Sequence, residues 1–144
     1  MRGRPIRSKG EGAQLVKDEL TAQLDAGMYE RGMSPWGSWA FATKESLSGR
    51  KSRVVVDYRL VNKRLQMAVY YIRRCDDVKE CLIGRCFLSS ADGARGYNLL
   101  RNTRRASEVL AVLSDVGCLL PLVLQLGPHT GPFDYQYCTD EIFT

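Results

Sequence analysis

Two short apolar runs on either side of a polar loop limit the possible folds of this chain more than any other feature. Residues 38–44 alternate aromatic with small side chains, and residues 53–58 are rich in valine. Alternation and β-branched side chains are typical of paired strands with one buried face. The intervening loop contains Gly49, so the two runs predict a β-hairpin. Its tip would carry three basic residues, Arg50, Lys51 and Arg53.

Three other segments carry helical signals. In residues 12–27, apolar side chains recur at steps of three and four, and a glycine follows them, as is typical of an amphipathic helix. Residues 75–84 predict a short helix, and residues 132–144 begin with a proline that suits a first helical turn. A further strand is expected over residues 86–92. The order of these elements indicates an α+β or mixed α/β fold.

Composition is that of one globular domain, with 144 residues of which 44% are hydrophobic and 26% charged. The net charge of +5 fits a polyanionic partner, and it equally fits a protein that uses charge to stay in solution. Arginine and lysine are most concentrated in residues 1–10, which predict a flexible basic arm.

Five cysteines at irregular spacings, with a single histidine, argue against a zinc site and for reduced thiols in an intracellular compartment. The expected location is therefore cytoplasmic or nuclear. An organelle is a further alternative, because organelle transit sequences are also basic and poor in acidic residues. No apolar run approaches the roughly 20 residues of a membrane-spanning helix, so no membrane span is expected.

The stretch FLSSADGARGY raises the question of chemistry, because it places one carboxylate, Asp92, at the end of the expected strand. Taken alone, Asp92 is best explained as a turn residue and Tyr97 as a core aromatic. Similarly, Arg53 alone is an ordinary exposed cation at a strand end.

Four stretches together resemble a known family. SPWGSW, RVVVDYRLVNK, FLSSADGARGY and LQLGPHTGPFDYQ occur in the order and spacing of the fingers and palm of a reverse transcriptase. The resemblance is closest to gypsy-type LTR-retrotransposon polymerases, whose corresponding stretches resemble SPWASP, RxxVDYRxLN, FSKLDLRSGY and MPFGLxNAPxxFQ. The separations also agree, with 30 residues from Asn62 to Asp92 and 35 from Asp92 to Gly127. The match runs from about residue 5 to residue 144.

The resemblance implies a role for several residues. Asp92 falls on the first of three catalytic aspartates, which hold two Mg²⁺ ions during phosphodiester formation. Arg53 falls on an arginine that contacts the triphosphate of the incoming nucleotide, and Tyr97 on the aromatic residue that excludes a 2′-hydroxyl. Gln136 falls in the motif that lies against template and primer. For the stretch DYRLVN the resemblance implies a structural role as part of the scaffold.

The family completes its metal site with a YxDD hairpin beyond the motif that ends at Gln136. Here Asp140 and Glu141 follow instead, on the expected C-terminal helix. One carboxylate cannot hold two Mg²⁺ ions against their hydration, so we expect no tightly bound metal and no polymerisation by this chain. Two further stretches depart from the family, with YYIR in place of YPLP and LQLG in place of MPFG.

The resulting prediction is an α+β, incomplete right-hand polymerase with fingers over residues 11–85 and a partial palm over 86–144, truncated before YxDD. The chain would be a fragment or degenerate copy of a retrotransposon RNA-directed DNA polymerase that contacts an RNA or DNA template–primer. Two alternatives stay open. One is a non-catalytic structural subunit of a larger assembly, and the other is a weak nucleic-acid-binding module that uses Arg50 and Lys51. An uncovered sheet edge and apolar face are expected around residues 119–126.

Overall fold

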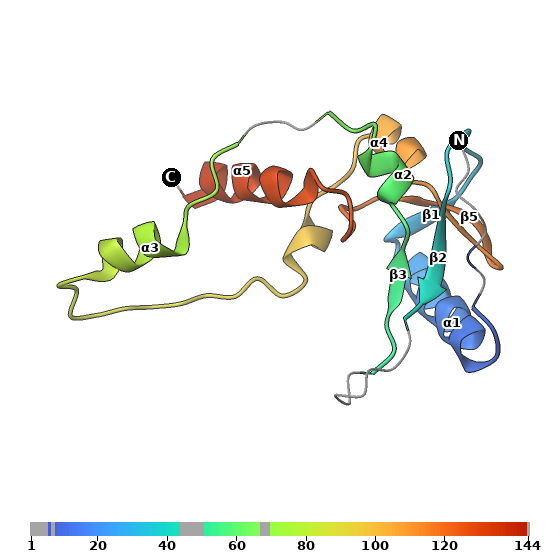
Figure 1. Cartoon of the computed structure of the whole chain (residues 1–144), viewed down its shortest axis with the longest axis horizontal. Coiled ribbons are helices and arrows are strands. Elements are labelled where there is room, and N and C mark those ends of the chain that lie inside the picture. Colours follow the sequence, from blue (N-terminus) through green and yellow to red (C-terminus); the bar gives the residue numbers. More distant parts are fainter. Residues whose placement is uncertain (1–5, 7, 44–50, 67–69, 144) are drawn as a thin grey trace.

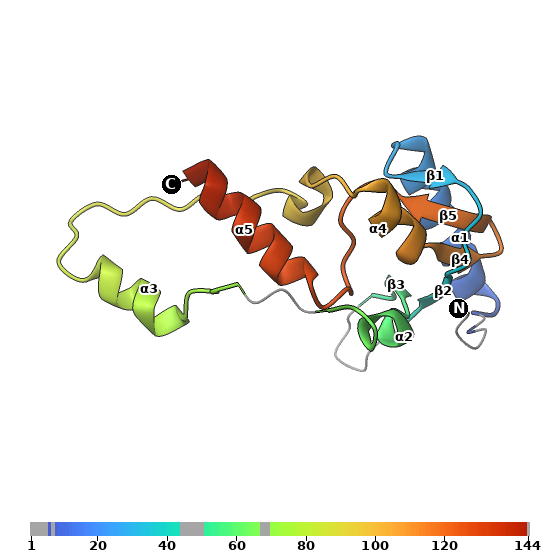
Figure 2. The same cartoon turned by 90° about the horizontal axis from the view of Figure 1, so that it is seen from above.

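The molecule is elongated and has two regions of different character (Figures 1 and 2). The computed structural model describes residue 6 and residues 8–43, 51–66 and 70–143. One end, here called the sheet lobe, contains the sheet with α1, α2 and α4. The other, here called the arm, consists of residues 70–95 and contains α3. Helix α5 (Gly131–Phe143) extends away from the sheet lobe alongside the arm.

The sheet lobe is built on one mixed sheet with the strand order β1-β5-β4-β2-β3. β2 pairs in parallel with β4, and all other neighbours are antiparallel. The strands are β1 (Tyr29–Arg31), β2 (Ser38–Ala42), β3 (Val54–Val56), β4 (Val112–Ser114) and β5 (Gly117–Pro121). The predicted hairpin is confirmed, because Ala40 pairs with Val56 and Ala42 with Val54. The fold is mixed α and β, which is compatible with the predicted α+β class.

All three predicted helices are present. α1 packs against β1, β2 and β3 and buries Val16 and Leu20, which belong to its predicted apolar face. The short helix α4 lies against β5. The helices are α1 (Glu11–Asp25), α2 (Arg59–Asn62), α3 (Cys75–Leu82), the 3₁₀ helix η1 (Gly96–Leu99), α4 (Arg104–Val109) and α5 (Gly131–Phe143).

The hydrophobic core lies between α1 and the sheet. Val112 and Leu119, on neighbouring strands, are fully buried, and Tyr58 after β3 is 2% exposed. Leu20 of α1 packs in the same cluster. Because the strands come from residues 29–56 and 112–121, the sheet joins parts of the chain on both sides of the expected boundary between fingers and palm. That boundary stays a prediction.

The predicted strand over residues 86–92 is wrong. In the structure these residues have no strand hydrogen bonding and are exposed throughout. A strand needs a neighbour that supplies the facing half of the ladder, and no strand in the described part of the chain lies beside this segment. Asp92 therefore stands in an extended, exposed segment and not at the end of a sheet strand.

The expected apolar face around residues 119–126 is also wrong for most of that stretch. Leu119 and Leu120 are fully buried and Leu124 is 6% exposed, whereas only Leu126, at 73%, projects into solvent among the leucines there. Leu119 packs in the core cluster with Val16 and Leu20 of α1, and the edge is covered by β1, which the sequence patterns did not predict. It pairs with β5 from Tyr29 opposite Pro121 to Arg31 opposite Leu119, and so covers that edge.

The predicted basic arm over residues 1–10 lies mostly outside the described residues. Residues 1–5 and 7 lie outside the described residues, but the Ser8 hydroxyl accepts a hydrogen bond of 2.9 Å from the backbone N–H of Ala42 in β2. This bond fixes the end of the segment to the sheet. None of the helices formed by the described residues is long and apolar enough to span a bilayer.

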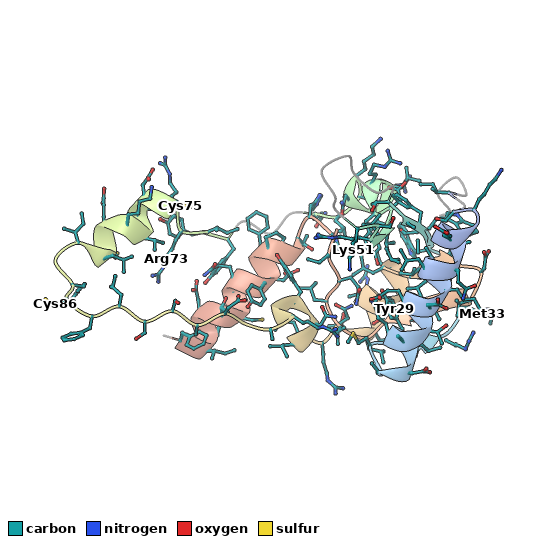
Figure 3. All side chains as sticks on the ribbon, turned by 90° about the horizontal axis from the view of Figure 1, so that it is seen from below. Tyr29, Met33, Lys51, Arg73, Cys75 and Cys86 are labelled. Atoms are coloured by element: carbon teal, nitrogen blue, oxygen red, sulfur yellow. The ribbon has the colours of Figure 1, made fainter. Side chains whose placement is uncertain are left out.

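All five cysteines are free thiols. Cys75 and Cys86 lie on the arm, far from Tyr29 in the sheet lobe (Figure 3). No group of three or more histidine, cysteine or acidic side chains among the described residues is arranged to hold a metal ion.

Candidate functional site

A cleft of about 580 Å³ opens where four parts of the chain meet. One part is the C-terminal half of α1, and another is β3 together with Arg53, which precedes it. The third is the turn that leads into η1, and the fourth is the turn after β5 and its following loop. The lining residues are Glu19, Leu20, Gln23, Met28, Arg53, Val54, Val55, Val56, Arg95, Gly96, Tyr97, Asn98, Gln125, Leu126 and Gly127.

The cleft brings together two of the predicted site residues, Arg53 and Tyr97, which are 44 positions apart in the sequence. The Arg53 backbone is held in the hairpin, since its N–H donates to Thr43 Oγ1 at 3.0 Å and its carbonyl accepts from Thr43 N–H at 2.8 Å. Its side chain is exposed and so can meet a ligand. The hairpin therefore fixes where the guanidinium starts while leaving it free to bind.

Tyr97 is positioned by helix α5. Its ring packs on that of Tyr135, with centroids 5.1 Å apart and planes tilted by 43°. Gly96 is required for this contact, because a Cβ there would lie 2.4 Å from the Tyr135 hydroxyl oxygen and 2.8 Å from its Cζ. The Gly-Tyr pair singled out in the sequence thus has a structural reason. The glycine lets the Tyr135 ring approach, and that ring supports Tyr97.

The scaffold residues of DYRLVN hold the turn at the cleft edge. The Asn62 side chain donates to the Gly127 carbonyl at 3.0 Å and accepts from the His129 backbone N–H at 3.1 Å. Gly127 has a φ of +120°, and a Cβ there would lie 2.9 Å from Cδ2 of Tyr58. The buried Tyr58 hydroxyl donates to the Leu110 carbonyl at 2.9 Å. These hydrogen bonds hold the DYRLVN and LQLG stretches next to each other.

Asp57 of the same stretch forms a local ion pair. Arg59 donates to both carboxylate oxygens of Asp57, each at 2.7 Å. These hydrogen bonds are the main reason that the pKa of Asp57 lies below its ordinary value. Because both partners lie outside the cleft lining, the pair belongs to the scaffold.

The floor of the cleft is tied to the core through Gln125. The Tyr29 hydroxyl donates to Gln125 Oε1 at 2.8 Å, and Gln125 Nε2 donates to the Val123 carbonyl at 3.1 Å. Burial, with a further contribution from the Glu19 charge, raises the pKa of Tyr29 well above its ordinary value. Tyr29 therefore stays neutral and acts as a hydrogen-bond donor at physiological pH.

The other predicted site residues do not line the cleft. Asp92 and Lys51 are exposed, on the arm and at the hairpin respectively, and Arg50 lies outside the described residues. Gln136 lies within α5, where its side-chain amide donates to Asp140 at 2.8 Å. The Asp140 carboxylate also accepts from Tyr70 at 2.9 Å, so this network joins α5 to the arm.

The described residues do not fit a two-metal site. Asp92 is the one family-matched carboxylate, and no other acidic side chain of the described chain groups with it into a set of three ligands. Asp140 and Glu141 lie on α5, and Asp140 is already hydrogen-bonded to Tyr70 and Gln136. A pair of Mg²⁺ ions needs several oxygen ligands held rigidly, which an exposed extended segment does not supply.

Sequence reasoning missed five polar cleft residues, Glu19, Gln23, Arg95, Asn98 and Gln125. Glu19 is one of several charged positions on the polar side of α1, and nothing in its spacing sets it apart. Arg95 had a signal, because it directly precedes the Gly-Tyr pair. The family stretch FSKLDLRSGY carries its arginine two residues after the aspartate, where this chain has Ala94, and the chain's own arginine follows one position later.

A second hollow, of about 310 Å³, lies between α4 and the start of α5. It is mainly apolar, with Leu65, Val109 and Leu124 among its lining residues. None of the residues predicted from the sequence to act in binding or chemistry lines it, so the cleft is the stronger candidate.

No protein-family model matches this chain. It is 27% identical over 131 residues to the Retrovirus-related Pol polyprotein from transposon 297 of Drosophila melanogaster, an alignment that covers 88% of this chain. The chain spans 12% of the length of that polyprotein. The similarity supports a retroelement origin of the Pol type.

Proposed function

We propose that this chain forms the fingers and part of the palm of an RNA-directed DNA polymerase of the gypsy retrotransposon type. In this proposal the cleft is the place where a deoxynucleoside triphosphate binds. The similarity to a transposon Pol polyprotein supports the origin, and the four sequence stretches support the polymerase segment.

The observation that carries the proposal is the convergence of Arg53 and Tyr97 on one cleft. A guanidinium is always charged and grips phosphate oxygens through two parallel N–H bonds, so Arg53 suits the triphosphate. Tyr97 offers an aromatic face held in place by Tyr135, which suits contact with a deoxyribose, and the resemblance assigns this ring the exclusion of a 2′-hydroxyl. Both groups enter the same cavity from elements that the scaffold residues fix.

Nucleotide binding tests this proposal directly. We expect dATP, titrated calorimetrically in EDTA, to bind the wild type at least about tenfold more tightly than Arg53→Ala, since a charge-assisted hydrogen bond contributes about 1.5–3 kcal/mol. Tyr97→Ala should reduce the preference for dATP over ATP. Arg85→Ala, an exposed arginine on the arm outside the cleft, is the matched control and should bind as the wild type does. Equal affinities for Arg53→Ala and wild type would contradict the proposal.

Catalysis is not part of the proposed activity of this chain. Asp92 is the one matched metal ligand, and its surroundings in the described chain do not complete a Mg²⁺ site. We therefore expect no extension of a primed RNA template with Mg²⁺ and labelled deoxynucleotides. Extension that disappears in Asp92→Asn would contradict this and would identify further carboxylates in the site.

Contacts with a template–primer are proposed to be weak and electrostatic. The exposed Lys51 contributes positive charge near Arg53 on the hairpin, as Arg50 would by its sequence position. Each phosphate contact on duplex contributes a log–log salt slope of about −0.9, so a handful of contacts predicts a shallow total slope. Binding that is insensitive to salt and selective for base sequence would argue against this assignment.

A second candidate function is a non-catalytic protein subunit descended from a retroelement. It is favoured by the apolar side chains that the arm exposes, among them Phe87 at 96%, Ile83 at 77% and Leu88 at 62%. Exposed apolar patches of this kind mark protein contacts. Nucleotide binding that is absent, together with a stable heteromeric complex that Phe87→Ser disrupts, would favour this candidate over the first.

A further inference from the structure

Arg95 is the one non-glycine residue with positive φ in the described part of the chain, at +53°. The left-handed conformation costs an ordinary residue about 1–2 kcal/mol, because its Cβ approaches the following carbonyl oxygen. Glycine or asparagine would adopt it more easily. An arginine in this conformation therefore indicates that the surrounding structure forces the backbone there and that the side chain has a use.

The turn that holds Arg95 is fixed by contacts on both of its sides. The Gly96 N–H donates to the Gly93 carbonyl at 3.1 Å, and the Asn98 N–H donates to the Arg95 carbonyl at 2.8 Å. The Asn98 side chain also approaches the Met28 sulfur at 3.2 Å, which ties η1 to the sheet lobe. Gly96 packs against Tyr135 of α5, as described above. The backbone of Arg95 is thus set by its neighbours, and its side chain emerges at the cleft.

The charges that line the cleft favour an anion. Arg53 and Arg95 enter from different elements, β3 and the turn before η1, and Glu19 is the one acidic residue among the lining residues. The Glu19 carboxylate already accepts a hydrogen bond of 2.5 Å from Gln23. By contrast, neither Arg53 nor Arg95 forms an ion pair with another described residue, although Arg59 and Arg104 both do. Both cleft guanidinium groups are exposed and available to a ligand.

We propose that Arg95 is a second phosphate-binding residue, so that the cleft grips a chain of phosphates between Arg53 and Arg95. The inference rests on the proposed function in one respect, namely that the phosphate chain is that of a nucleotide. A chain of linked phosphates offers oxygens to guanidinium groups on two separate elements, and each group can bind such oxygens through paired N–H donors. We therefore expect longer phosphate chains to bind this cleft more tightly.

Inorganic polyphosphates test this without a nucleoside. We expect tripolyphosphate to bind the wild type more tightly than pyrophosphate, and orthophosphate to bind least, in calorimetric titrations with EDTA present. Arg95→Gly should weaken tripolyphosphate binding about tenfold, as one lost charge-assisted contact predicts. It should also remove most of the preference over pyrophosphate. Glycine is chosen because it adopts positive φ without strain, so the turn keeps its shape.

Two further variants separate charge from structure. Arg95→Lys keeps the charge and should retain more tripolyphosphate affinity than Arg95→Gly, while losing the paired N–H geometry. Arg85→Ala removes an exposed arginine from the arm, outside the cleft, and should bind as the wild type does. Equal losses in Arg85→Ala and Arg95→Gly would show a general charge effect and would overturn the inference.

The outcomes also distinguish this inference from the proposed function. If dATP binding depends on Arg53 but tripolyphosphate binding is unchanged in Arg95→Gly, or is absent, the role of Arg95 is wrong and the nucleotide site stands. If tripolyphosphate binding depends on Arg95 but the deoxynucleoside of dATP adds no affinity and Tyr97→Ala has no effect, Arg95 has the inferred role. In that case the polymerase assignment of the cleft is wrong.

Discussion

The sheet lobe and the arm contain similar apolar residues, but these side chains are buried in the sheet lobe and exposed on the arm. Val112 and Leu119 of the sheet lobe are completely buried, whereas Phe87 and Ile83 of the arm are 96% and 77% exposed. The difference lies in their neighbours. Each strand of the sheet lobe has a partner strand, and β1, β2, β3 and β5 also pack against α1 or α4, while residues 86–92 have neither among the described residues. Apolar sequence alone therefore does not decide burial, because burial needs a second surface.

The arm is held together mainly by local hydrogen bonds. Within α3, Asp77 accepts from the Arg74 backbone N–H at 3.2 Å and from the Tyr71 hydroxyl at 2.7 Å. α3 has 8 residues and buries none of them. Helices shorter than about 12–15 residues are marginal in water without packing. The arm reaches α5 through Tyr70, whose hydroxyl donates to Asp140 and whose ring meets that of Tyr137 at 5.6 Å.

The largest expected effect is a difference in amide hydrogen exchange between the two regions. The strands β4 and β5 contain fully buried residues, so their backbone amides should exchange only when the core opens. Helix α3 buries no residue, so its amides should exchange through local opening. We expect protection factors in the sheet lobe to exceed those in the arm by about a thousandfold or more, since local opening free energies range from near zero to the global value. Similar protection in α3 and β5 would remove the distinction between the regions.

Core truncation should affect one region and not the other. Leu119→Ala removes a fully buried side chain from the middle of the sheet and should lower the free energy of unfolding by about 3 kcal/mol. Leu88→Ala, on the arm at 62% exposure, should change it by less than about 0.5 kcal/mol. Urea denaturation followed by circular dichroism measures both. A large loss in Leu88→Ala would reveal a partner surface for the arm.

The junction between the arm and α5 can be probed with two glycines. A Cβ at Gly96 would lie 2.4 Å from the Tyr135 hydroxyl oxygen, so Gly96→Ala should cost about 1–3 kcal/mol and displace Tyr97. Gly93→Ala is the matched control. A Cβ at Gly93 would lie 3.2 Å from the same hydroxyl oxygen, so this substitution should have the smaller effect. Thermal unfolding gives the stability, and dATP titration tests whether the cleft is lost. Equal effects of the two substitutions would argue against the packing described here.

The buried tyrosines predict a loss of stability in alkali. Burial raises the pKa of Tyr58 well above its ordinary value of 10.0, and it does the same for Tyr29. The folded state therefore keeps protons that the unfolded state releases, so the free energy of unfolding falls as pH rises above 10. Tyr58→Phe should flatten this fall. At neutral pH the same substitution should cost about 1–2 kcal/mol, because the buried Leu110 carbonyl loses its 2.9 Å hydrogen bond.

A small effect is also expected for Asp92. Its side chain is exposed on the arm, with no metal-binding group around it in the described residues, so Asp92→Asn should change the stability at neutral pH by less than about 1 kcal/mol. Chemical denaturation with and without Mg²⁺ checks this. A Mg²⁺-dependent stabilisation of the wild type that Asp92→Asn abolishes would show that the arm folds around a metal site.

Much of the sheet lobe could be predicted from local patterns. The steps of three and four in residues 12–27 gave α1, and the valines after Arg53 gave β3 and its hairpin with β2. β1, in contrast, has only 3 residues and no alternation long enough to detect, so the cover of the β5 edge was missed. Its burial comes from pairing with residues some 90 positions away in the sequence, which no local pattern contains.

The candidate site shows the same division between what the sequence by itself determined and what only the tertiary structure decided. The sequence determined the residue types suited to phosphate and sugar contacts, Arg53 and Tyr97, because chemistry and motif spacing are written along the chain. The tertiary structure decided that these two line one cleft, that Arg95 joins them, and that Asp92 and Gln136 do not. The physical reason is that a side chain's neighbours are set by long-range packing, here by Tyr135 against Gly96 and by Asn62 against Gly127.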